Sequence, residues 1–387
     1  MGYGDYSYKA HQEIVSTRST KSREEVFRQR KVHPLMNPHG VKFRESRDSA
    51  DHPNSLPIVF ALDVTGSMGT IPELLAKTEL PHFMQGLLAS GVTDPQVMFL
   101  AFGDAFCDSG PLQVGQFEST AEDIDRWLTW SWLEGRGGGN GGESYDLAMY
   151  FAARHTITDS MERRNKRGYF FMTGDEPPFK TTSKSVVKSL IDADIERDIP
   201  LQQVVDELSC SYHPFFLIPD QGRRRVENVW RQYLGDHVLV LDQPQDTCHV
   251  AAGLVALCEG LVTDLDMLAV KMSKEGLTRQ QVGSVVRAIS PFAATLDKDG
   301  SGPVPVEPVA EAAAAAEAEA PDMLSVTGSR VNLRNGPGTR YSVVGQLVRG
   351  DEVERLTDNG AGWIKLRSVR GGRIGWMADD FLEVASN

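Results

Sequence analysis

The stretch PIVFALDVTGSMG, residues 57–69, joins an apolar run to a polar loop. The run is apolar and partly β-branched up to Asp63, which favours a buried strand. The loop carries the hydroxyl side chains of Thr65 and Ser67, together with glycines that permit a tight turn. A buried strand that ends on a carboxylate and precedes a helical segment indicates an α/β fold with polar groups gathered at one edge of a sheet.

Similar apolar runs recur along the chain and alternate with amphipathic stretches. The further runs are QVMFLAFG, GYFFMTG, HPFFLIP and HVLVLD. The stretches with helical periodicity include IPELLAKTELPHFMQGLLASG, AEDIDRWLTWSWL, ESYDLAMYFAARHT and RRVENVWRQYLG. Strands that alternate with helices imply a mostly parallel sheet covered on both faces. We therefore predict a doubly wound, Rossmann-type α/β domain over residues 53–270.

Three of the predicted strands are followed at once by an aspartate. These residues are Asp63, Asp104 and Asp175. In a doubly wound sheet, ligand sites form from the loops at the carboxyl ends of the strands, so we expect chemistry at these positions. Asp104 fits two roles equally, a turn-forming residue and a carboxylate that contacts a partner.

The first of these loops combines a carboxylate with two hydroxyls. Alternate residues at a strand end can direct the oxygens of Asp63, Thr65 and Ser67 toward one point, and Mg²⁺ accepts such oxygen ligands. The structural alternative is a hydroxyl-rich cap of the following helix.

This loop resembles the metal-ion-dependent adhesion site of von Willebrand factor A domains, in which Asp-x-Ser-x-Ser follows the first strand. Thr65 takes the place of the first serine, and Asp175 in FMTGDEPP matches the aspartate of the third loop. The second loop corresponds to GRGGGNGGES, residues 135–144, where Asn140, Glu143 or Ser144 can offer an oxygen. The resemblance implies one Mg²⁺, Mn²⁺ or Ca²⁺ ion held by five residues, namely Asp63, Thr65, Ser67, Asn140 and Asp175.

The resemblance also implies how such a site is used. An incompletely coordinated cation recruits a carboxylate from a partner protein, and residual positive charge on the ion favours that contact. Asp104 and Glu143 are expected beside the partner. In bacteria, such domains often work with an ATPase of the MoxR or chelatase type, which is the partner class that the resemblance implies.

The end of the chain changes character. Residues 271–322 contain a short helical piece and a segment rich in Ala, Pro and Glu that is typical of a linker. Residues 323–385 then show short strands and turns, with VNLRNGPG at 331–338, GWIKL and GRIGWMADDFLE. This pattern resembles bacterial Src homology 3 domains and predicts a small all-β barrel that binds a peptide or glycan. Tyr341, Trp363 and Trp376 are candidates for an aromatic groove, whereas packing of the barrel explains the tryptophans equally well.

Composition narrows the class of protein. The formal charge of −13 argues against non-specific binding to nucleic-acid phosphates. No apolar run approaches the roughly 20 residues of a membrane span. Residues 1–52 form a basic, polar arm expected to pack on the first domain. The chain shows no secretory signal and no paired metal-ligand cysteine spacing, so we expect a cytoplasmic protein.

These observations favour a non-enzymatic adaptor that binds one partner through a metal and a second ligand through its barrel. One alternative is a metal-dependent hydrolase that uses Asp63, Asp104, Asp175 and Glu176, although no nucleophile and base are paired in the sequence. Another is a cell-wall-targeted protein released from a phage or a bacterium.

Overall fold

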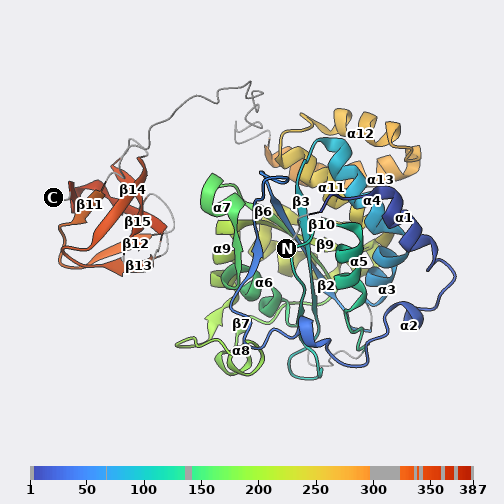
Figure 1. The fold of residues 1–387 in the computed structure, drawn as a ribbon, viewed down its shortest axis with the longest axis horizontal. Helices are drawn as coiled ribbons and strands as arrows, with labels where there is room; N and C mark the ends of the chain where they lie inside the picture. The colour runs from blue at the N-terminus through green and yellow to red at the C-terminus, as the bar shows by residue number, and fades with distance from the viewer. Residues whose placement is uncertain are drawn as a thin grey trace. The chain divides into compact units, whose positions relative to one another are not determined.

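The computed structural model describes residues 4–66, 68–135, 142–296, 323–334, 338–339, 343–358, 362–369 and 374–384. The chain forms two compact units, Met1–Glu307 and Pro308–Asn387 (Figure 1). We call the first the α/β unit and the second the β unit, and we describe each by itself.

A six-stranded sheet lies at the centre of the α/β unit. In spatial order its strands are β10 (Val238–Val240), β9 (Tyr212–Ile218), β6 (Gly168–Thr173), β2 (Leu56–Asp63), β3 (Pro95–Phe102) and β4 (Leu112–Val114). Neighbouring strands are parallel except β3 and β4, which are antiparallel. The five predicted runs are strands, and β4 adds an edge. The predicted doubly wound, mostly parallel fold is confirmed.

Alternate side chains of β2 enter two different cores. Phe60 and Leu62 pack under one helix layer, whereas Val59 and Ala61 pack under the other. The first layer comprises α3 (Thr70–Leu74), η2 (Leu75–Glu79), α4 (Leu80–Ser90), α5 (Ala121–Thr129), α11 (Thr247–Cys258), α12 (Leu265–Lys274) and α13 (Arg279–Leu296) (Figure 1). The second comprises α6 (Tyr145–Arg154), α8 (Lys184–Ile191), α9 (Leu201–Ser211), η3 (Gln221–Val226) and α10 (Glu227–Leu234). Because both faces are covered, β2 is buried along its whole length.

The helical segment predicted after β2 is interrupted. Its middle part, η2, is a single π-helical turn between α3 and α4, and Pro81 lies in the first turn of α4. Proline cannot donate to the helical hydrogen-bond ladder, and π turns are a usual way to accommodate an irregular ladder.

The N-terminal segment packs against the α/β core. Within it, α1 (Tyr8–Ser16) contacts α4 and α5, and α2 (Arg23–Val26) places Val26 in the core. Arg18 forms a bidentate ion pair with Asp125, and β1 (Arg44–Ser46) pairs with β5 (Thr156–Thr158). The packing expected of residues 1–52 is therefore present, and it makes the segment part of the first compact unit instead of a separate arm.

The last helix of the α/β unit also differs from the predicted organisation. The sequence predicts a short helical piece here, set apart from the α/β domain together with the linker; in the structure α13 buries Val285, Ile289 and Phe292 against the core formed with α11 and α12. Because its apolar face is buried in these contacts, the helix belongs to the α/β unit. The remaining short elements are η1 (Pro34–Met36), α7 (Asp159–Arg164), β7 (Thr181–Thr182), β8 (Ile199–Pro200), η4 (Gly235–His237) and η5 (Pro244–Asp246).

The β unit consists of a seven-stranded antiparallel sheet. Its strands are β11 (Met323–Val326), β12 (Val331–Arg334), β13 (Val343–Leu347), β14 (Glu352–Asp358), β15 (Trp363–Ser368), β16 (Ile374–Ala378) and β17 (Leu382–Val384), with η6 (Asp379–Phe381) between the last two. Alternating residues such as Leu324, Leu333, Leu366 and Met377 form its own core. The predicted all-β fold of this region is confirmed.

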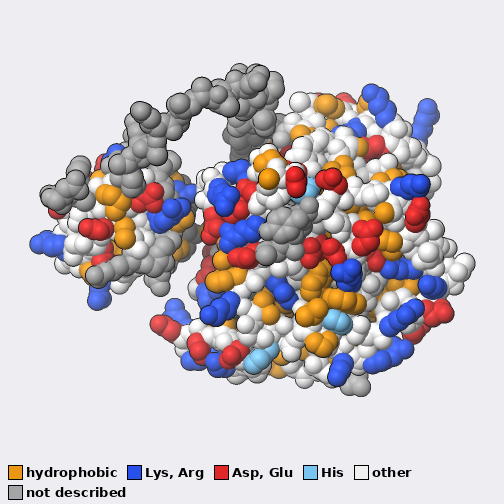
Figure 2. Space-filling view, in the orientation of Figure 1, with side chains coloured by type: hydrophobic (Ala, Val, Ile, Leu, Met, Phe, Trp, Pro, Cys, Tyr) orange, Lys and Arg blue, Asp and Glu red, His pale blue; other side chains and the backbone are white. Residues whose placement is uncertain are grey.

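The surface of the α/β unit mixes charges of both signs. On the face shown in Figure 2, Lys and Arg side chains lie among Asp and Glu side chains and apolar patches. Within the described residues, no helix combines the length and apolar character needed to cross a bilayer.

His213 makes the stability of the α/β unit sensitive to acid. Its imidazole stacks on Tyr169, and burial, with the nearby Arg167 and His237, lowers its pKa to about 3. The unfolded state therefore binds a proton that the folded state does not, and stability falls as pH drops below about 6.5. Relative to wild type, we expect His213→Phe to gain up to about 2 kcal/mol of unfolding free energy between pH 7 and pH 5.

The measurement is urea unfolding of both proteins at several pH values. His39→Phe, at an exposed position, controls for the loss of an imidazole. A His213→Phe difference that does not change with pH would show that His213 is protonated equally in both states.

Candidate metal-binding site

Asp63 ends β2, in the middle of the sheet, and its carboxylate is completely buried. The Oδ1 atom accepts hydrogen bonds from the backbone N–H of Thr65, at 2.9 Å, and from Thr65 Oγ1, at 2.6 Å. The Oδ2 atom accepts a bond of 3.2 Å from the hydroxyl of Tyr145. Thr65 therefore lies directly beside Asp63, and both oxygens of the carboxylate are held in place.

Glu143 lies directly beside this pair. Its backbone N–H bonds to the carbonyl of Pro177 and its carbonyl accepts from Phe179, which ties the second loop to the third. Its carboxyl group contacts Asp63, yet the buried Oε2 atom has no hydrogen-bond partner among the residues that the structure describes. The sequence placed Glu143 beside a partner or, alternatively, among the oxygens of the second loop. In the structure it contacts Asp63 and is only 4% exposed.

Asp175 follows β6 and supplies a third buried carboxylate. Arg223 donates from Nε to its Oδ2 atom over 3.2 Å, and Arg225 donates to its backbone carbonyl over 3.3 Å. Asp175 is close enough to Asp63 and Glu143 for its negative charge to favour their protonated forms. The structure thus gathers three carboxyl groups from three separate loops at one sheet edge.

The electrostatics of this cluster are those of a site that attracts cations. Burial raises the pKa of Asp63, and burial together with contact to Asp63 raises the pKa of Glu143 to about 10. In the absence of a cation, the pair shares a proton at neutral pH. The buried, unpartnered Oε2 of Glu143 and the hydroxyl and carboxylate oxygens around it are the hard donors that Mg²⁺, Mn²⁺ and Ca²⁺ prefer.

Carboxylates alone do not complete a metal shell here. Among the residues that the structure describes, no three His, Cys, Asp or Glu side chains form a metal-binding group. A cation at this cluster would therefore need hydroxyl or water oxygens in addition to the carboxylates. Ser67 and Asn140, two of the predicted ligands, lie outside the described residues.

Tyr145 and Gly174 position the cluster, and sequence reasoning did not identify either. The Tyr145 hydroxyl donates to Asp63 and accepts from the backbone N–H of Glu176. Its ring is held by Phe102 and Trp230. A Cβ atom at Gly174 would lie only 2.2 Å from the Tyr145 hydroxyl oxygen. In the sequence, the signals that could have identified them are the position of Tyr145 in the first turn of a predicted helix and that of Gly174 just before Asp175.

Asp104 lies just after β3, at the end of the predicted strand; its side chain is buried, and its described contacts are local. Its Oδ1 atom accepts from the N–H of Phe106 at 2.8 Å, and its own N–H donates to Asp108 at 2.7 Å. The hydroxyl oxygen of Ser144 accepts a hydrogen bond from the N–H of Ala105. These contacts are those of a structured turn, which is one of the two roles the sequence left open.

The aromatic candidates of the β unit lie outside its core. Trp363 pairs with Ala378, and Trp376 pairs with Lys365, in the ladder of β15 and β16. Both tryptophans are half-buried, whereas the intervening Ile364 and Met377 face the core. The tryptophans thus occupy the outer face of the sheet. Tyr341 lies outside the described residues.

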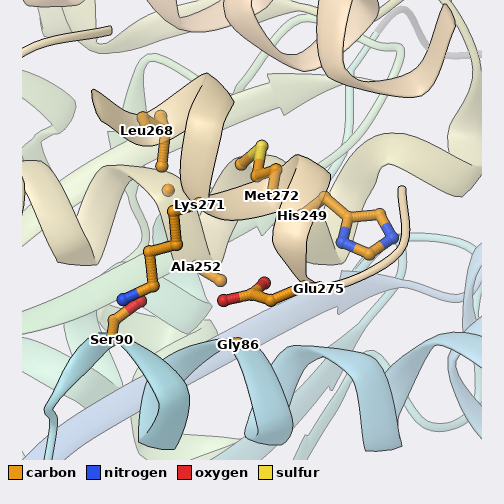
Figure 3. A pocket seen from close by; sticks show the side chains of 9 residues that line it. Gly86, Ser90, His249, Ala252, Leu268, Lys271, Met272 and Glu275 are labelled. Carbon is orange, nitrogen blue, oxygen red and sulfur yellow. The ribbon is translucent and has the colours of Figure 1, made fainter. Parts of the chain in front are cut away.

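A small cavity of about 20 Å³ lies among α4, α11 and α12 (Figure 3). Its lining includes Ser90, His249, Lys271 and Glu275. The volume is about that of one water molecule. None of its lining residues belongs to the carboxylate cluster.

Comparisons with known proteins give distant structural similarities and one family match. Proximal thread matrix protein 1 from the mussel byssus is 13% identical, with a TM-score of 0.36, over 58% of this chain and 51% of that chain. Another structure of that protein, described as having a zinc-occupied MIDAS motif, is 15% identical, with a TM-score of 0.36, over 57% of this chain and 51% of that chain. The pilus adhesin SpaC from Lactobacillus rhamnosus GG, in an open conformation, is 10% identical, with a TM-score of 0.37, over 86% of this chain and 44% of that chain. The chain thus spans about half the length of these proteins.

No curated protein matches the sequence. The family model described as "Bacterial SH3 domain" matches residues 329–383. This range covers most of the seven-stranded antiparallel sheet and includes both tryptophans of its outer face. Residues 329–383 are therefore a bacterial SH3 domain, joined to a doubly wound α/β unit.

Proposed function

We propose that the protein is a non-enzymatic adaptor whose α/β unit holds one divalent cation and captures a partner protein through it. The observation that carries this proposal is the buried cluster of Asp63, Glu143 and Asp175, in which Oε2 of Glu143 has no hydrogen-bond partner within the described part of the chain. Burying three carboxyl groups together is costly unless positive charge compensates them. A divalent cation supplies that charge. We propose Mg²⁺, with Mn²⁺ or Ca²⁺ as alternatives.

Different residues of the chain would orient the carboxylates, ligate the cation and add negative charge at such a site. Thr65 and Tyr145 fix the two oxygens of Asp63, so the carboxylate is oriented before a cation arrives. Glu143 adds an oxygen from the second loop, and Asp175 adds charge from the third. Ser67 and Asn140 remain proposed ligands. A bound cation would supply residual positive charge, to which a carboxylate of the partner can bind.

Two features favour binding over catalysis. Among the carboxylates that a hydrolase would use, Asp104 accepts a hydrogen bond within its own turn and Glu176 pairs with Arg225. Several histidines that could serve as a base are half-buried and stack on aromatic rings, including His155 on Phe151 and His213 on Tyr169. These contacts suit structural roles.

The rest of the proposal concerns partners and location. We propose an ATPase of the MoxR or chelatase type as the protein partner of the metal site, with Asp104 at the edge of that contact. We propose that the outer face of the bacterial SH3 domain, with Trp363, Trp376 and Tyr341, binds a peptide or a glycan. Solvent-facing tryptophans are typical of such grooves. We propose a cytoplasmic protein that binds neither nucleic acid nor membranes.

The test is a Mn²⁺ titration of the full chain, followed by electron paramagnetic resonance and by thermal unfolding. We expect one ion per chain and a rise in the unfolding temperature of the α/β unit with Mn²⁺, because a ligand that binds only the folded state stabilises it. Mg²⁺ should compete for the site. Absence of binding, or binding without any effect on unfolding, would contradict a cation site in the buried cluster.

Partner capture is tested separately, by pull-down from a host lysate in Mg²⁺ and in chelator. We expect a set of proteins that is retained only in Mg²⁺. The same set in both conditions would contradict metal-mediated capture.

A further inference from the structure

We propose that Arg223 is a built-in competitor of the divalent cation: it neutralises Asp175 while the site holds no metal, and it is transferred to Asp220 when the metal binds. This inference rests on the proposed function. It adds a residue that sets how tightly the site holds its ion.

The first observation is the contact itself. The Arg223 guanidinium donates from Nε to the Asp175 carboxylate over 3.2 Å, and the Asp175 side chain is only 5% exposed. The Arg223 side chain is 30% exposed, so its end reaches solvent while its charge reaches the cluster. A partly exposed arginine can change its partner without a rearrangement of the core.

The second observation is that Arg223 already has another acceptor. Its NH1 atom pairs with the carboxylate of Asp220, and Asp220 also caps η3 by accepting from the backbone N–H of Arg223 at 3.1 Å. The guanidinium therefore bridges one carboxylate in the cluster and one outside it. Transfer to Asp220 alone breaks one charge-assisted hydrogen bond and keeps the other.

The neighbouring arginines differ from Arg223 in what they contact. Arg224 pairs with Glu227, and Arg225 pairs with Glu176 and with the backbone carbonyl of Asp175. Neither of these described contacts involves a carboxylate of the cluster. Arg224 is therefore a matched control, since it lies in the same short helix and has the same charge.

The positive charge of Arg223 should oppose the binding of a divalent cation at Asp175. A guanidinium and a divalent cation that share Asp175 repel each other, and the repulsion is strong because the carboxylate is buried. Cation binding must therefore include the cost of displacing Arg223. Removing that positive charge should tighten cation binding, whereas removing the alternative acceptor Asp220 should weaken it.

The experiment is a Mn²⁺ titration of the full chain, measured by electron paramagnetic resonance, for wild type and four variants. We expect Arg223→Gln to bind Mn²⁺ about tenfold more tightly, a size typical of one close like charge. Arg224→Gln should match wild type. Asp220→Asn, which can still cap η3, should bind several-fold more weakly, and the double variant should match Arg223→Gln.

Thermal unfolding provides a second measurement that separates folding from binding. In chelator, Arg223→Gln should unfold at a lower temperature than wild type because Asp175 loses its counter-charge. Mn²⁺ should then raise the unfolding temperature more in Arg223→Gln than in wild type. Equal or weaker Mn²⁺ binding by Arg223→Gln, with wild type still binding one ion, would overturn the competition and leave the metal site standing. Failure of both proteins to bind would overturn both proposals.

Discussion

Asp63→Asn is expected to abolish Mn²⁺ binding and Mg²⁺-dependent partner capture while leaving the α/β unit folded. Asparagine keeps an oxygen for the two hydrogen bonds from Thr65, so the end of β2 retains its local structure. It removes the charge of a carboxylate that is completely buried. We expect the affinity for Mn²⁺ to fall by at least about 100-fold, or about 2.7 kcal/mol.

The same substitution should not destabilise the protein in chelator. Without a cation, Asp63 and Glu143 share one proton, and the remaining negative charge of the pair lies close to the negative charge of Asp175. Replacing one carboxylate with a neutral amide relieves that repulsion, so the unfolding temperature in chelator should equal or exceed that of wild type. Asp63→Ala should lose capture as well. An unfolded Asp63→Asn protein would show that the cluster is required for folding.

A matched substitution nearby tests whether Mn²⁺ binding depends on the carboxylates of the cluster or on negative charge in general. Asp108→Asn also changes a carboxylate in a loop after a sheet strand, but the described hydrogen bond of Asp108 is with the N–H of Asp104, which donates to it. We expect its Mn²⁺ affinity to stay within about threefold of wild type, because its described hydrogen bond is to the Asp104 turn. A loss as large as that of Asp63→Asn would mean that the cation lies elsewhere.

Gly174→Ala is expected to destabilise the α/β unit by about 3 kcal/mol, at the upper end of the usual cost of overpacking. The added Cβ would lie 2.2 Å from the hydroxyl oxygen of Tyr145 and 2.5 Å from Cε1. The ring cannot move aside easily, because it is completely buried and contacts Phe102, Phe216 and Trp230. Tyr145 must then lose its contact with Asp63 or Glu176.

Urea unfolding and Mn²⁺ titration together test this expectation. Besides the loss of stability, we expect Gly174→Ala to bind Mn²⁺ more weakly, because Tyr145 no longer orients Asp63. Gly283→Ala is the control, since a Cβ there approaches only the flexible end of Arg287 at 3.3 Å within α13. That variant should be unchanged or more stable by about 0.5–1 kcal/mol. Wild-type stability in Gly174→Ala would show that the loop after β6 adapts without strain.

Tyr145 and Arg223 illustrate what sequence patterns miss in a site of this kind. Asp63, Thr65 and Asp175 were predicted because each immediately follows, or lies close behind, a recognisable buried strand. Tyr145 reaches the same place from the start of α6, and Arg223 reaches it from η3, 48 residues beyond its partner Asp175. No local spacing relates these side chains to the predicted loops.

The boundaries of the α/β unit also depend on contacts that sequence patterns do not reveal. Hydrophobic periodicity located the five parallel strands, but it did not show that the N-terminal residues and α13 complete the same unit. Val26 and Phe292 become core residues only through contacts with helices far away in sequence. The polar N-terminal segment was therefore predicted to be an arm, because its few core residues are recognised only from their contacts in space.

The sequence by itself determined the doubly wound α/β fold, the meeting of polar loops at the carboxyl edge of the sheet, and the all-β domain at the end. These features follow from local periodicity and turn chemistry, which each segment carries in its own residues. Only the tertiary structure decided that Glu143 contacts Asp63, that Tyr145 orients it, and that Arg223 neutralises Asp175. Those contacts join segments that are far apart in the sequence. Local residue patterns do not reveal how such segments pack together.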